Sequence, residues 1–138
     1  MATLIHSLLA VALLFGSAAA APQPESDVRT IIGGYFAVDH IGPKAFADVE
    51  QRALASPILY LGIIERLAVA GTPDFLSATF IPHAIAWIGV KHPAEVKSLA
   101  ARLLPVYRKA RATPRRGNQL DRDERLDDAI RELARLAR

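Results

Sequence analysis

The side chains best suited to metal chemistry in this 138-residue chain are its histidines, because the sequence contains no cysteine. Beyond the first 20 residues these are His40, His83 and His92. No two of them stand four residues apart, and no His-Glu-x-x-His string occurs. A zinc site needs three or four ligands that converge at about 2.0–2.3 Å, and no local spacing here predicts such convergence. We therefore expect no metal site and no cofactor.

Glu65 is the acid that stands most clearly among apolar neighbours. Two interpretations of it are open: an exposed charge beside Arg66, or a buried acid that faces a pocket opposite His83. Thr79, His83 and Trp87 lie at i, i+4 and i+8 on one predicted helix, and such a stripe can line a ligand pocket between helices. The alternative for His83 is a hydrogen bond within the core. The pocket candidates are therefore Glu65, Thr79, His83 and Trp87.

The motifs of nucleophilic and phosphate-binding enzymes are missing from the sequence. There is no Gly-x-Ser-x-Gly elbow, and the pair Gly33-Gly34 belongs to no phosphate-binding string. We expect no catalytic residue on this basis. The sequence favours a small binding or interaction module, and the alternative is a small enzyme or ligand-binding protein with an interhelical pocket near Glu65 and His83.

The strongest electrostatic feature is the segment 97–116, which holds seven positive residues and no acid. Such a segment can bind phosphate groups of envelope components or a protein partner. Its one aromatic residue, Tyr107, lies on the apolar side of the predicted helix, so we expect no nucleic-acid partner. The alternative is a solvated helix face whose charge is balanced by the acidic start of the last helix. The candidate binding residues are Lys97, Arg102, Arg108, Lys109, Arg111, Arg115 and Arg116.

The N-terminus has the pattern of an export signal. No charged side chain precedes Glu25, an apolar run covers residues 8–15, and small residues follow it up to Ala21. This pattern predicts a signal peptide over residues 1–20, hence a periplasmic or secreted protein with at most peripheral membrane contact. The alternative is an N-terminal membrane anchor, because the first 24 residues are uncharged and long enough to span.

The elements that position these residues are helices that begin at prolines. Pro43, Pro57, Pro73 and Pro93 each precede a run with helical periodicity, and proline suits the first helical position because it has no N–H to leave unpaired. Ser56 and Thr72 are suitable N-cap residues for two of these helices. We therefore expect helical hairpins with very short turns.

The chain as a whole is predicted to be an all-α bundle of five to six short helices in one domain, since no sustained alternation of apolar and polar residues occurs. The segment 26–40 carries an amphipathic stripe with two glycines inside it, while segments 57–70 and 73–91 are apolar almost all round and should lie centrally. The expected helices are 26–40, 43–55, 57–70, 73–91, 93–111 and 119–137. The expected organisation is a signal peptide (1–20), an extended linker (21–25), a helical core (26–111), a basic loop (112–119) and a C-terminal amphipathic helix (120–138).

N-terminal sequencing of the exported protein tests the prediction at the amino end. We expect the sequence to start at Ala21, because the small residues before it match a cleavage site. Recovery of the chain from the membrane fraction with residues 1–20 still attached would contradict cleavage and favour the anchor.

Overall fold

Helix follows helix along the chain in the computed structural model, which describes residues 23–33, 35–71, 77–114, 117 and 119–138. The all-α fold class is confirmed, since this described part holds seven helices and no strand. The predicted signal peptide, 1–20, lies outside the described residues. The helices are α2 (Gln23–Ile32), α3 (Tyr35–Ile41), α4 (Pro43–Ala55), α5 (Pro57–Ala70), α6 (Ser77–Ile88), α7 (Pro93–Ala112) and α8 (Gln119–Leu136).

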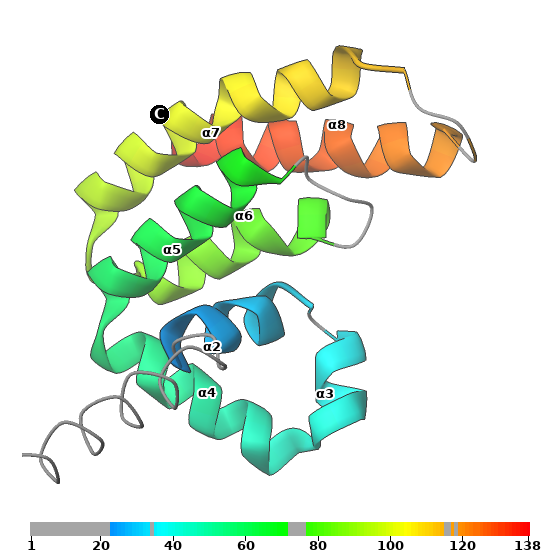
Figure 1. Cartoon of the computed structure of the whole chain (residues 1–138). Coiled ribbons are helices and arrows are strands. Elements are labelled where there is room, and N and C mark those ends of the chain that lie inside the picture. The colour runs from blue at the N-terminus through cyan, green and yellow to red at the C-terminus, as the bar shows by residue number, and fades with distance from the viewer. Residues whose placement is uncertain (1–22, 34, 72–76, 115–116, 118) are drawn as a thin grey trace, which may run out of the picture.

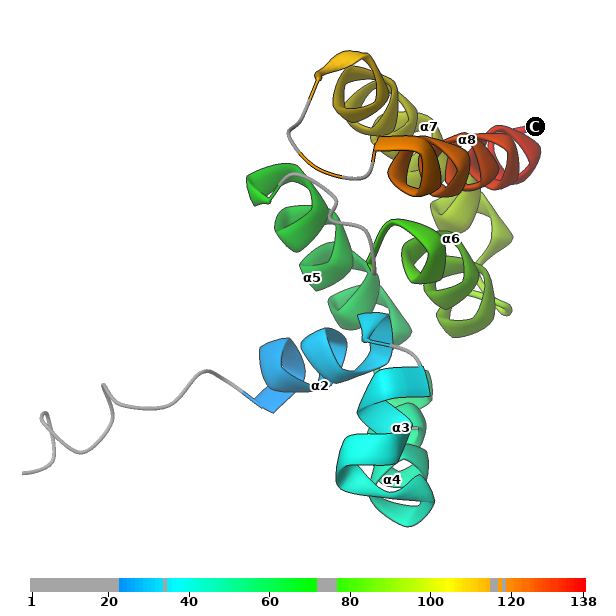
Figure 2. The ribbon, with the colours of Figure 1, turned by 90° about the vertical axis from the view of Figure 1, so that its right-hand side faces the viewer.

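The helices form three tiers (Figures 1 and 2). Helices α7 and α8 lie side by side and antiparallel at one end, α5 and α6 lie in the middle, and α2, α3 and α4 form the other end. Helix α2 contacts α4, α5 and α6, while α8 contacts α6 and α7. The middle tier therefore joins the two ends of the molecule.

Three of the four proline-started helices are confirmed with their predicted first residues, Pro43, Pro57 and Pro93. Pro73 and the proposed cap Thr72 lie outside the described residues. Ser56 occupies the N-cap position of α5, but its side chain makes no capping hydrogen bond, so the expected side-chain cap is wrong. Its carbonyl accepts the first helical bond, from the Tyr60 N–H at 3.2 Å.

The N-terminal part of the fold differs from the prediction in two ways. Helix α2 begins at Gln23, so residues 23–25 are helical and not an extended linker. The expected helix 26–40 is two helices, since α2 ends at Ile32 and α3 begins at Tyr35. Gly33 ends α2 with its N–H 3.2 Å from the carbonyls of both Arg29 and Thr30. This division raises the helix count above the predicted five to six.

One hydrophobic core runs from the first described helix to the last. Its members come from α2, α4, α5, α6, α7 and α8, so the C-terminal helix docks on its own bundle. Tyr107 is completely buried at the centre of α7, with no exposed surface. The largest fully buried apolar side chains are Val28, Ile64, Ile81, Ile85, Ile88, Leu103, Tyr107, Leu126 and Leu133.

Part of the apolar surface of α4 and α5 faces solvent. Leu54 is 46% exposed, and Ile58 and Leu59 are 51% and 53% exposed. Helix α5 buries only the side that meets its neighbours, which leaves a second apolar side open and corrects the expectation of burial all round. No single helix among the described residues is long and apolar enough to cross a membrane; α4 and α5 pass that test only together, at a bend of 105°.

A buried carboxylate joins α2, α4 and α5. Asp27 is 1% exposed, and its two oxygens accept hydrogen bonds from the Arg52 Nε (2.8 Å), the Arg52 Nη2 (2.9 Å), the Tyr60 hydroxyl (2.6 Å) and the Gln23 amide (2.7 Å). Arg52 and Tyr60 stand on opposite sides of the turn between α4 and α5. Because both bind the same carboxylate, the angle between these two helices is fixed by Asp27.

The electrostatics of this cluster follow from its hydrogen bonds. The bonds from Arg52 outweigh burial and lower the pKa of Asp27 from 3.8 to about 2. The pKa of Tyr60 is raised to about 12, chiefly by burial and to a smaller extent by the Asp27 carboxylate. Asp27 is therefore ionised and Tyr60 is a neutral donor at neutral pH.

A second polar cluster fastens α8 to the end of α7. The nearly buried guanidinium of Arg122 donates to the carbonyls of Ala110 and Thr113, the latter at 3.1 Å. Arg111 binds Asp127 at 2.9 Å and Asp123 at 3.2 Å. Carbonyls at a helix C-terminus have no partner within the helix, so Arg122 supplies donors that α7 itself lacks.

Replacement of Asp27 tests the first cluster. We expect Asp27→Asn to lower the free energy of unfolding by about 2–3 kcal/mol, because the Arg52 guanidinium and the buried Tyr60 hydroxyl lose a charged acceptor. The extra stability of the wild type over Asp27→Asn should be complete above pH about 4 and disappear as the pH falls to about 2. The reason is that the pKa of Asp27 is lower in the folded state than in the unfolded state.

Urea unfolding at a series of pH values measures both effects. Asp48→Asn, on the exposed side of α4, is the matched control and should change neither. Equal effects of the two substitutions, or a difference that does not vary with pH, would contradict the role given to Asp27.

Candidate functional site

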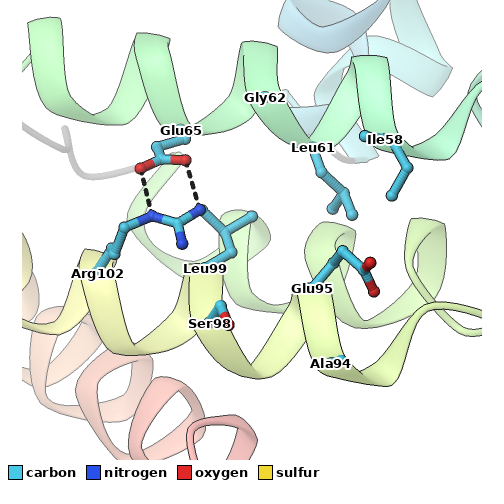
Figure 3. A pocket seen from close by; sticks show the side chains of 9 residues that line it. All are labelled: Ile58, Leu61, Gly62, Glu65, Ala94, Glu95, Ser98, Leu99 and Arg102. Carbon is cyan, nitrogen blue, oxygen red and sulfur yellow. Dashed lines mark hydrogen bonds and ion pairs between the residues drawn. The ribbon is translucent and has the colours of Figure 1, made fainter.

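A groove separates α5 from α7 and encloses about 310 Å³ (Figure 3). Ile58 and Leu61 project into it from α5 at one end, and Glu65 meets Arg102 at the other (Figure 3). Gly62 lies between these ends and leaves the α5 wall without a side chain. We name this hollow the α5–α7 groove; its lining residues are Ile58, Leu61, Gly62, Glu65, Ala94, Glu95, Ser98, Leu99 and Arg102.

The charged end of the α5–α7 groove is a two-bond ion pair. The Arg102 Nε lies 2.7 Å from one Glu65 oxygen and its Nη2 lies 2.9 Å from the other (Figure 3). These bonds lower the pKa of the Glu65 carboxyl. A general acid requires a raised carboxyl pKa, so Glu65 is an ionised partner of Arg102 and has the wrong shift for that role. Arg66, its sequence neighbour, instead binds Glu25 at 2.6 Å.

A second hollow, of about 270 Å³, lies beside α6 and is mostly apolar. Four helices contribute to it, with α6 facing residues of α2, α3 and α4. We name it the α6 pocket; its lining residues are Ile31, Val38, Phe46, Glu50, Phe80, His83, Ala84 and Trp87.

The structure does not bring the four pocket candidates into one site. His83 and Trp87 line the α6 pocket, whereas Glu65 lines the α5–α7 groove. The backbone of Thr79 lies in α6, but its side chain is outside the described residues. His83 is exposed and lies near enough to the carboxylate of Glu132 on α8 to lower the pKa of that group, after the larger effect of Arg135. The geometry therefore offers no proton relay between Glu65 and His83.

Helix α7 divides the predicted basic residues into two groups. Arg102 and Arg111 are held in ion pairs with acids of α5 and α8. Lys97, Arg108 and Lys109 are exposed, and none of them forms an ion pair within the part of the chain that the structure describes. Arg115 and Arg116 lie outside the described residues.

The α6 pocket contains residues that the sequence analysis missed. Phe46 and Glu50 stand four residues apart on α4 and so project from the same side of that helix. Phe80 and Trp87 are seven apart on α6, which gives the same alignment. The spacing within each pair is visible in the sequence, but the meeting of the two pairs is a tertiary arrangement of α4 and α6, which no local pattern predicts.

Among the described residues, no group of three or more histidine, aspartate or glutamate side chains is placed to hold a metal ion. Comparisons of the chain with protein-family models, with curated proteins and with solved structures give no match. The function is therefore inferred from the grooves and surface charges of this chain.

Two arginines allow structural and surface roles to be separated. We expect Arg122→Ala to lower the free energy of unfolding by about 1–3 kcal/mol, because the Thr113 carbonyl loses its Arg122 donor and the Ala110 carbonyl keeps only the Thr113 N–H. Arg108→Ala, on the exposed side of α7, should change it by less than about 0.5 kcal/mol. Chemical denaturation of both variants is the measurement, and a larger loss in Arg108→Ala would contradict this division.

Proposed function

We propose that this protein is an exported, non-catalytic binding module that attaches to phosphate-bearing anionic components of the cell envelope. The contact surface is the basic face of α7, defined by Lys97, Arg108 and Lys109. Export is proposed from the signal-peptide pattern of residues 1–20.

The observation that carries this proposal is the separation of the charges on α7. Arg102 and Arg111 point to neighbouring helices and are neutralised there. The three members of the basic face are exposed to solvent and are balanced by no acid among the described residues. They form a group of exposed positive charges on α7 without ion-pair partners among the described residues.

The spacing of the basic face suits an extended anionic surface better than one small anion. Lys97 and Arg108 are eleven residues apart, which is close to three full turns, so they share one side of α7 at a separation of about 16 Å. Lys109 directly follows Arg108 and is rotated from it by about 100° around the helix axis, so it lies on the far flank of the exposed side of α7. A single phosphate cannot span that distance, whereas an array of headgroups presents several phosphates at once.

The expected strength of the attachment follows from the number of charges. Each lysine or arginine near an anionic membrane surface contributes about 1 kcal/mol, and the effect falls off within a Debye length. Three such residues give weak, reversible attachment that depends on salt. This fits peripheral contact, because Leu104, the apolar side chain between Lys97 and Arg108 on the same side of α7, is half-buried and packs against the core.

The competing proposal is a protein partner that uses the same basic face. A protein with an acidic surface would bind the same three residues and would show a similar dependence on salt. The two differ in the ligand that suffices for binding, because lipid vesicles carry the phosphate array without any protein.

Charge reversal tests the proposed function. We expect the variant Lys97→Glu with Arg108→Glu to bind vesicles containing phosphatidylglycerol at least about tenfold more weakly than wild type, since two favourable charges become repulsive. Co-sedimentation with vesicles at low salt measures this, and addition of salt should weaken wild-type binding.

The matched control is Lys44→Glu with Arg138→Glu, which changes the net charge equally at two exposed positions outside α7. Equal loss in both double variants would show that only net charge matters. Failure of wild type to bind the vesicles at low salt would overturn the lipid assignment and leave the protein partner as the explanation for the basic face.

A further inference from the structure

We propose that the α6 pocket is a binding site for a small organic cation of the methylated-ammonium class. This site shares no residue with the basic face of α7, so its success or failure is independent of the function proposed above. The walls of the pocket, its charge and its size all favour a ligand of this class.

Three aromatic rings contribute to the walls of the pocket. Phe46 comes from α4, and Phe80 and Trp87 come from α6. All three side chains are half-buried, so each is held by the fold and still meets the pocket. The faces of aromatic rings carry negative partial charge and attract cations, with tryptophan the strongest, and quaternary ammonium groups are recognised in this way.

The charged lining of the pocket has the sign that a cation requires. Glu50 is the acid that lines it, and no lysine or arginine is among the described lining residues. This carboxylate is half-buried and forms no ion pair with a lysine or arginine in the described part of the chain. A cation in the pocket would supply the partner that Glu50 lacks, whereas an anion would be repelled by it.

The small number of polar groups lining the α6 pocket favours a methylated ammonium over a primary ammonium. A primary ammonium carries three N–H donors and needs acceptors for them when it leaves water. Among the described lining residues the pocket offers the Glu50 carboxylate and the His83 ring, and the others have apolar side chains. A methylated ammonium has no such demand, because its charge is spread over methyl groups that pack against Ile31, Val38 and the aromatic rings.

The size of the pocket limits the ligand to a few heavy atoms. Its volume of about 270 Å³ is slightly below the range of about 300–1,000 Å³ typical of sites for drug-sized ligands. A single trimethylammonium group with a short polar tail satisfies this limit. We therefore choose choline as the probe of this ligand class.

The protein contains its own reporter for this site, because Trp87 is the only tryptophan in the sequence and lines the pocket. Titration of the purified chain with choline should change the tryptophan fluorescence and saturate with a midpoint on the order of 1 mM. The neutral isostere 3,3-dimethylbutan-1-ol, which replaces nitrogen by carbon, should bind at least about tenfold more weakly.

Two variants test the residues that the proposal uses. Glu50→Gln keeps the shape of the side chain but removes its charge, and we expect it to weaken choline binding about tenfold. Phe46→Leu removes one aromatic face and should also weaken binding while the circular dichroism of the helices is unchanged. Glu124→Gln, at an exposed position on α8, is the control and should bind choline as wild type does.

The proposal is overturned if the neutral isostere binds as well as choline, because the pocket would then be merely apolar. It is also overturned if folded Glu50→Gln binds choline normally, or if choline gives no saturable response. A fluorescence response to phosphatidylcholine vesicles without one to choline would assign the site to a lipid headgroup and overturn the assignment to a free solute.

Discussion

The buried carboxylate of Asp27 is the constraint on which the arrangement of the first helices depends. A charge that is 1% exposed is stable in a protein interior only when it is paired and hydrogen-bonded, and four donors from α2, α4 and α5 meet that need. Since Arg52 and Tyr60 come from both sides of the single-residue connection at Ser56, the cluster sets the 105° bend between α4 and α5. That bend positions Phe46 and Glu50 of α4 opposite α6, which creates the α6 pocket.

At the other end of the molecule, ion pairs involve some of the positive side chains of α7 and leave those of the basic face without partners among the described residues. Arg122 and Arg111 hold α8 against α7, and Arg102 connects α7 to Glu65 of α5. Because these arginines are used inside the fold, the positive charge that remains available on α7 belongs to the basic face. The proposed function depends on this distinction between paired and unpaired cations. The amino-acid composition of the segment 97–116 does not reveal which of its cations are paired. Glu65 is also no longer a catalytic candidate, because its carboxylate is paired with Arg102.

The helices could be predicted from the sequence because local signals mark them: the prolines at 43, 57 and 93 begin three helices at the predicted residue. The division of the segment 26–40 into two helices was not predicted, since glycines inside an amphipathic stripe do not by themselves end a helix and the outcome depends on tertiary contacts. Both buried charges also had a local signal. Asp27 lies four residues before Ile31 and Arg122 four before Leu126, so each stands on a buried side of its helix. Gln23 is a local partner of Asp27. The other partners were not predictable, because Arg52 and Tyr60 lie 25 and 33 residues from Asp27 and those of Arg122 lie at the end of the preceding helix.

The central claim is that the exposed side of α7 makes the contact with anionic envelope components. Amide chemical-shift mapping of the isotopically labelled protein, titrated with dihexanoyl phosphatidylglycerol below its micellar concentration, tests this claim most directly. The account predicts that the largest shifts lie at and around Lys97, Arg108 and Lys109, while α8 and the exposed apolar residues of α4 and α5 change little. Shifts concentrated at Leu54, Ile58 and Leu59, or an absence of saturable shifts on α7, would contradict it.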